Sequence, residues 1–223
     1  MASTKLFLPL AASILMLLGS PCPAAAQAPD NLQLHKVSAA AAEYRGIKAI
    51  HITQAPGVQG EDTLAIITGP ELLDGTIEAD LAGAPAPGAF GEARGFIGLA
   101  FRVQPSAAKF ELIYLRPTNG RAEDQLRRNH STQYVSFPDW PWQRTRKETP
   151  GLYESYTDLE PGVWTKVRIV VSGAKARLYV RNADQPCLII NDLKLPPVKG
   201  AIGLWTGPGT DGYFGNVRIM PRE

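Results

Sequence analysis

The chain has 223 residues, of which 44% are hydrophobic and 20% charged, a composition too apolar for a disordered segment. Its 23 Lys and Arg against 21 Asp and Glu give a formal net charge of +2, which argues against a nucleic-acid partner bound through charge. The 21 Gly and 19 Pro are too many chain breakers for a helical bundle and suit short strands joined by turns. We therefore expect a folded, strand-rich protein.

Residues 1–28 have the features of a secretory signal peptide. Lys5 precedes an apolar block, Leu6 to Leu18, that is short for a membrane span. The small residues from Ala24 to Ala28 provide an Ala-x-Ala cleavage site; an uncleaved anchor helix is the alternative. We expect a single mature domain over residues 29–223, periplasmic or secreted in a bacterium, with no stable membrane insertion after cleavage. Cys187 would then be its only cysteine, which excludes an internal disulfide.

Ten later segments have the pattern of strands and are bounded by Gly, Pro, Asn or Asp clusters. They predict an all-β fold, a two-sheet antiparallel sandwich. The Ala-rich segment from Val37 to Glu43 is the candidate for a short helix, and Ser172-Gly173 predicts a tight hairpin. The ten segments are Ile47 to Thr53, Thr63 to Thr68, Gly75 to Leu81, Gly95 to Val103, Lys109 to Leu115, Val163 to Ser172, Ala174 to Arg181, Cys187 to Asn191, Ala201 to Trp205 and Tyr213 to Met220.

Alternation within these segments predicts which side chains face the core. In the segment from Gly95 to Val103, every second residue should face inward, which leaves Arg102 on the open face; the inward residues are Ile97, Leu99, Phe101 and Val103. Glu111 should point away from Phe110. The two segments over residues 163–181 share a basic outer face, for which we favour a solvated surface over a ligand site.

A long connection, residues 116–162, shows little regular pattern and is too rich in aromatic residues for a flexible linker. Aromatic rings beside planar hydrogen-bonding groups suit a sugar, whose C–H faces pack on a ring while its hydroxyls need donors and acceptors. Trp140 and Trp142 are the candidate stacking platforms. The alternative is that the aromatics, above all Phe137, Tyr153 and Tyr156, form a small core of the connection itself. Candidate polar contacts come from Arg102, Arg116, Arg128 and Gln133.

Cleavage of a glycoside would need an acid/base pair of carboxyl groups. Glu111 is the candidate, with Asp124, Asp139 or Glu154 as its partner, and His130 has catalytic potential in the connection. No metal-ligand spacing is found around the three His, so we expect no metal or other cofactor. Asp211, in a predicted hairpin loop over residues 207–212, is the one candidate calcium ligand.

Four C-terminal segments resemble the closing strands of concanavalin A-like jelly rolls: residues 164–171, 176–180, 200–205 and 214–219. With Phe96-Ile97-Gly98-Leu99 and Phe110-Glu111 as middle strands, the chain looks like the bacterial exported domains grouped with 3-keto-disaccharide hydrolases over residues 60–220. It departs from that family at Ala93-Arg94-Gly95-Phe96, where an Asn-Ser-Gly is usual.

Three functions remain open after this comparison. The first is binding of a glycan on the concave face of the jelly roll, beside the long connection. The resemblance implies a second, hydrolase or lyase activity on 3-keto-glycosides through a carboxylate base. The third is a non-catalytic structural protein of the cell envelope.

Overall fold

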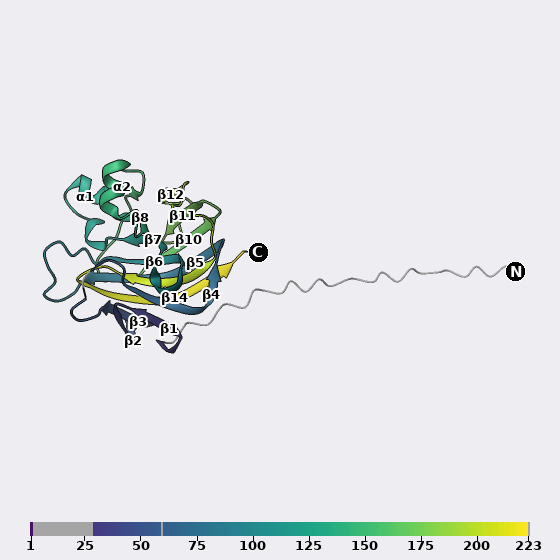
Figure 1. The fold of residues 1–223 in the computed structure, drawn as a ribbon, viewed down its shortest axis with the longest axis horizontal. Coiled ribbons are helices and arrows are strands. Elements are labelled where there is room, and N and C mark those ends of the chain that lie inside the picture. Colours follow the sequence, from purple (N-terminus) through teal and green to yellow (C-terminus); the bar gives the residue numbers. More distant parts are fainter. Residues whose placement is uncertain (2–28, 59, 223) are drawn as a thin grey trace.

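Two antiparallel seven-stranded sheets pack face to face in the computed structural model, which describes residues 1, 29–58 and 60–222 (Figure 1). Sheet A has the order β1 (Leu32–His35), β4 (Leu64–Leu72), β13 (Gly200–Thr206), β6 (Ile97–Val103), β7 (Phe110–Leu115), β8 (Thr132–Phe137) and β9 (Glu154–Ser155). Sheet B has the order β12 (Leu188–Ile190), β11 (Lys175–Val180), β10 (Thr165–Ser172), β5 (Gly75–Pro85), β14 (Thr210–Pro221), β3 (Ile47–Gln54) and β2 (Val37–Tyr44). The predicted all-β sandwich is confirmed.

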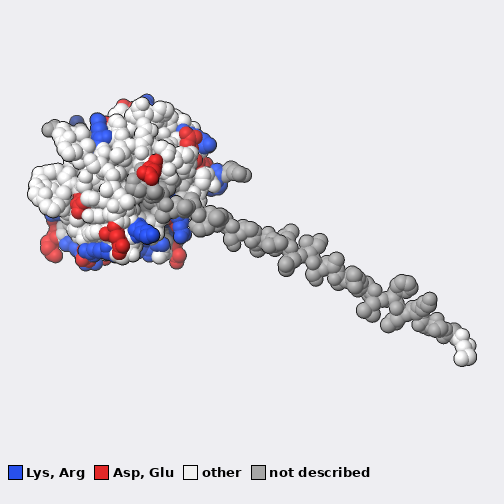
Figure 2. Space-filling model, turned by 90° about the horizontal axis from the view of Figure 1, so that it is seen from below, with Lys and Arg blue, Asp and Glu red and all other residues white. Residues whose placement is uncertain are grey.

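The helices are short and lie outside the two sheets (Figure 1). They are α1 (Gln125–Asn129), α2 (Trp142–Glu148) and the 3-10 turns η1 (Pro29–Asn31), η2 (Pro105–Ala107) and η3 (Pro117–Asn119). None of the helices in the described ranges is long and apolar enough to cross a membrane. Charged side chains of both signs are intermixed on the face seen in Figure 2, in keeping with the near-neutral composition.

The main core lies between the sheets and follows the predicted alternation. Ile97, Leu99 and Phe101 of β6 are fully buried there, and Val167 and Ile169 of β10 meet them from sheet B. Burial of each such side chain contributes about 1.5–3 kcal/mol to folding. The apolar alternation of these strands is therefore the main force that holds the two sheets together.

Three local predictions have different outcomes. The segment from Val37 to Glu43 is part of strand β2, not a helix, because it pairs with β3 along its whole length; tertiary pairing overrides the helix preference of alanine. The hairpin at Ser172-Gly173 is confirmed, since Ser172 pairs with Lys175. The segment over residues 207–212 is not a hairpin loop, because it joins β13 of sheet A to β14 of sheet B.

The long connection is more regular than its sequence suggested. It contains β8, which pairs with all of β7, as well as α1, α2 and the two-residue strand β9. Asp124 caps α1 by accepting a hydrogen bond from the Arg127 amide at 2.9 Å. The aromatic residues do not form a core of the connection itself. Phe137 packs in a second apolar cluster built mainly from other strands of sheet A, Tyr153 enters the main core, and Tyr156 is exposed.

Arg102 does not lie on the open face, contrary to our prediction, but inside the sandwich, and Val103 packs in the outer cluster instead of the core. Glu111 points away from Phe110, as predicted, but it too lies inside the sandwich. A bulge in β6, where Arg102 has a positive φ of 54°, turns its side chain inward to the carbonyls of Leu73 and Gly173. Glu111 is fully buried and accepts hydrogen bonds from the Leu195 amide and the Tyr134 hydroxyl, both at 2.8 Å. Burial raises the pKa of this carboxyl above its usual value.

Replacement of Glu111 by Gln should destabilise the fold. A carboxylate accepts at both oxygens, whereas an amide presents one oxygen and one NH2, so either the Leu195 amide or the Tyr134 hydroxyl would lose its acceptor. We expect Glu111→Gln to lower the free energy of unfolding by about 1–3 kcal/mol in urea denaturation. Glu148→Gln, at an exposed pair with Arg144, is the control and should change it by less than about 0.5 kcal/mol. Equal effects of the two variants would contradict this assignment.

Candidate functional site

A row of side chains crosses the outer face of sheet A from β13 to β9. Trp205 pairs with Gly98, Gly98 with Tyr114, Tyr114 with Gln133, and Gln133 with Glu154. Gly98 has no side chain, and a Cβ there would lie 2.5 Å from the Cβ of Tyr114. The Tyr114 and Trp205 rings therefore meet across it at 4.8 Å between centroids. The row is aromatic at one end and polar at the other.

The aromatic end of this row is closed by neighbouring loops. The Trp142 indole nitrogen donates to the Glu61 carboxylate at 3.2 Å, and the Trp205 indole nitrogen donates to the Glu61 carbonyl at 2.6 Å. Between these residues and Phe137 a cavity of about 40 Å³ remains, far below the roughly 300–1,000 Å³ of small-molecule sites. This end of the row is packed, so it offers no room for a sugar ring.

Arg116 organises the polar end. Its guanidinium donates to the Tyr114 hydroxyl at 2.8 Å, the Gln133 side-chain oxygen at 3.0 Å and the Glu154 carboxylate at 3.1 Å. It also donates to the His130 carbonyl at 3.1 Å. The three side-chain contacts are buried and the contact with the His130 carbonyl is part-buried, so Arg116 ties the loop after α1 to three neighbouring strands.

Glu154 receives a second cation from α2. Arg146 forms two hydrogen bonds with its carboxylate, one of them from Nε to Oε2 at 3.1 Å. His130 approaches from a third side, with Nε2 3.5 Å from Oε2. The buried charge of Glu154 is thus balanced by Arg116 and Arg146, which are in turn held in place by it.

A pocket of about 490 Å³ opens beside this network, at the β9 edge of sheet A. Its polar wall includes His130 and Arg146, while Tyr156 and Leu126 are 41% and 67% exposed at its apolar side. The pocket is lined by Leu126, Asn129, His130, Arg146, Pro150, Gly151, Glu154, Ser155 and Tyr156. Its volume lies within the usual range of small-molecule sites.

Tyr156 and His130 are the two rings that a ligand would meet in this pocket. The Arg128 guanidinium lies 5.2 Å from the Tyr156 ring centre and donates to the Tyr156 hydroxyl at 3.0 Å, which fixes the ring. Burial, together with the charges of Arg146 and Arg116, lowers the pKa of His130 below its usual value. At neutral pH His130 is therefore uncharged and carries one donor and one acceptor nitrogen.

The structure brings together only some of the predicted site residues. Arg116, Gln133, Arg128 and His130 meet at the pocket, but Arg116 and Gln133 are buried beneath it and act as supports. Trp142 closes the aromatic end of the row, as described above. Leu126 and Asn129 were missed, since an exposed leucine and an asparagine in a loop carry no spacing signal of their own.

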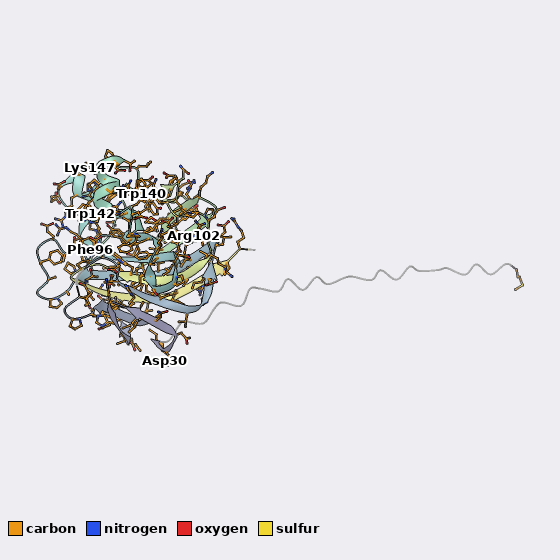
Figure 3. The ribbon with its side chains drawn as sticks, viewed as in Figure 1. Asp30, Phe96, Arg102, Trp140, Trp142 and Lys147 are labelled. Carbon is orange, nitrogen blue, oxygen red and sulfur yellow. The ribbon has the colours of Figure 1, made fainter. Side chains whose placement is uncertain are left out.

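Trp140 lies apart from both the pocket and Trp142. Its ring centre is 3.7 Å from the Arg144 guanidinium carbon and 4.4 Å from the Lys194 ammonium, on the segment that follows β12. Figure 3 shows Trp140 and Trp142 at separate positions near α2. The two tryptophans therefore do not form one continuous platform.

Removal of the Arg116 charge should strongly destabilise the protein. Arg116→Met would leave the Glu154 carboxylate with less charge compensation and would remove the donor to Gln133 and Tyr114. Loss of one partner of a buried pair costs about 3–5 kcal/mol, which urea denaturation would measure. Arg181→Met, at an exposed pair with Asp158, is the control and should cost less than about 1 kcal/mol. Similar losses in both variants would show that the buried network is unimportant.

The lowered pKa of His130 predicts a pH dependence of stability. The unfolded chain binds a proton at an imidazole near pH 6.5, whereas folded His130 binds it only at lower pH. The unfolded state thus holds more protons in this window, and the free energy of unfolding falls as the pH drops through it. Between pH 7.5 and 5.5 we expect urea denaturation to show a larger fall for the wild type than for His130→Gln. A larger fall for the variant would contradict this interpretation.

Comparisons with known proteins support the fold. No protein-family profile matches the chain, and no curated protein sequence matches it. Among solved structures, the carbohydrate-binding module CBM66 from Bacillus subtilis is 15% identical, with a TM-score of 0.54, and the match covers 84% of this chain and 96% of the module. A Bacillus subtilis protein of unknown function with a galectin-like fold is 11% identical, with a TM-score of 0.53 over 86% of this chain and 90% of that one.

A third similar structure is the exoplasmic/lumenal domain of VIP36, in a form bound to Ca2+ and Man3GlcNAc. It is 11% identical, with a TM-score of 0.50 over 88% of this chain and 86% of that domain. Identities this low establish the fold alone. The predicted concanavalin A-like jelly roll is confirmed by these likenesses.

Proposed function

We propose that the protein is an exported carbohydrate-binding protein that holds a glycan in the pocket between α1, α2 and β9. The observation that carries the proposal is the half-exposed Tyr156 ring at the side of a 490 Å³ pocket whose other wall is polar. A pyranose presents apolar C–H faces and polar hydroxyl edges, and this pocket offers the matching surfaces.

Specific groups would receive the hydroxyls of the sugar. Arg146 donates, neutral His130 can both donate and accept, and Asn129 offers a side-chain amide. Because Glu154 already holds Arg146, Gln125 holds Asn129, and Arg128 holds the Tyr156 ring, little conformational entropy would be lost on binding. The side chains of the pocket would therefore need little rearrangement when a glycan binds.

Binding is a better fit to the geometry than glycoside cleavage. Glu111, the expected acid or base, is fully buried between the sheets and satisfied by two donors. Glu154, the carboxylate at the pocket, is held by two arginines, whose hydrogen bonds already occupy its oxygens. The pair of available carboxyl groups that cleavage needs is therefore absent from the pocket walls.

Two further observations are consistent with the proposal. One of the similar structures is a carbohydrate-binding module and another was solved with a bound oligosaccharide. Export rests on the signal-peptide pattern alone, and residues 2–28 of that leader lie outside the described residues. A periplasmic or secreted protein would meet extracellular or envelope glycans.

Truncation of Tyr156 should weaken glycan binding. A glycan array would first identify a ligand for the wild type, and calorimetric titration would then compare the variants. We expect Tyr156→Ala to weaken binding by about tenfold or more, equivalent to about 1.4 kcal/mol, because the stacking surface is lost. Phe90→Ala removes an equally exposed ring outside the pocket and should leave the affinity unchanged. Equal losses, or an array without any bound glycan, would refute the proposed function.

A further inference from the structure

A second surface, the outer face of sheet B, combines cations, hydroxyl-binding groups and aromatic rings. On β10, Val167 and Ile169 face the core, so Lys166 and Arg168 face outward. Lys166 pairs with Asp80 of β5, and Arg168 pairs with Glu78, which also pairs with Arg218 of β14. Three neighbouring strands thus present a charged face that the pocket at β9 does not use.

The cations of this face outnumber its carboxylates. Lys166, Arg168 and Arg218 stand beside Asp80 and Glu78 as cross-strand neighbours. The Arg168 guanidinium lies 3.7 Å from the centre of the Tyr179 ring on β11. This part of the face therefore carries a small excess of positive charge, which favours an anionic partner that also has hydrogen-bond donors for the two carboxylates.

A bulge in β14 hollows this face between the charges. The register shifts between Gly215 and Arg218, and a depression of about 140 Å³ results, lined by Glu78, Ala79, Asp80, Lys166, Asn216 and Arg218. That volume equals four or five water molecules at about 30 Å³ each, enough to receive one polar group of a ligand. The buried Asp80 carboxylate accepts from the Asn216 amide at 2.6 Å, which orients both groups at its wall.

Aromatic side chains adjoin the depression. Trp164, two residues before Lys166, lies over Gly215, where a Cβ would be 3.5 Å from the indole ring. Its edge meets Tyr44, which stacks on Tyr213 with 3.9 Å between ring centres. His51 stacks on the other side of Tyr213, at 4.5 Å. These half-buried rings form an apolar surface next to the charged depression.

We infer that the outer face of sheet B is a separate binding surface for an acidic polysaccharide built from uronic acid units. Lys166 and Arg218 would hold the sugar carboxylate, Asp80, Glu78 and Asn216 would meet its hydroxyls, and Trp164 would cover an apolar ring face. The carboxylates on the protein distinguish this surface from a plain anion site, since they can accept hydrogen bonds from sugar hydroxyls, which a polyphosphate chain does not have. The inference does not depend on the pocket at β9.

Retardation of the full chain in native gels that contain polygalacturonate tests this inference. We expect the wild type to bind, and a K166A/R218A variant to bind at least tenfold more weakly. A K109A/K147A variant removes the same charge from exposed positions elsewhere and should bind like the wild type. Equal thermal unfolding midpoints would establish that all variants are folded.

Three results would overturn the inference. The first is no retardation of the wild type by polygalacturonate. The second is an equal loss in K166A/R218A and K109A/K147A, which would indicate only a general charge effect. The third is equally strong binding to inorganic polyphosphate, because that polymer has no sugar hydroxyls that could donate hydrogen bonds to Asp80 and Glu78.

Discussion

The buried ion pair between Arg116 and Glu154 is the contact on which the long connection depends. β9 has only two residues, too few to hold an edge by backbone pairing alone. Arg116 adds the contacts that this short strand cannot make, because its guanidinium donates to groups on β7, β8, β9 and the loop after α1. Arg146 adds α2 to the same carboxylate. These contacts fix the positions of β9, α2 and the loop after α1, and the pocket is the space that remains between them.

The same connection explains why the open site lies at an edge of the sandwich and not on a face. Trp142 and the Glu61 loop cover the aromatic side chains on the outer face of sheet A, so that this face has become a second core. Tyr114 links the two regions, since its ring packs on Trp205 and its hydroxyl accepts from Arg116. The closed aromatic end gives the polar end a rigid support.

Sequence alternation was sufficient to predict the sandwich and its core, because side chains on a strand must alternate between faces. It failed at Arg102, where one extra residue in β6 reverses the facing of the side chain. A bulge of this kind depends on the partner strand β13, which lies about a hundred residues further along the chain. The sequence predicts the site only as a region of the chain. It shows that the connection is rich in aromatic and polar residues, but long-range strand pairing decides which of them come into contact. Glu154 and Tyr156 reach the pocket because β9 pairs with β8. With two residues, β9 is too short to produce an alternation pattern in the sequence.

The inward turn of Arg102 also bears on how the molecule moves. Arg102 lies on a strand of sheet A, and its guanidinium donates to carbonyls of the β4–β5 and β10–β11 turns. This rim of the sandwich therefore cannot open unless these hydrogen bonds break. Amide exchange at that rim should then be slow, because the two turns cannot separate without breaking these hydrogen bonds. A single buried side chain thus fastens two turns that are far apart in the sequence.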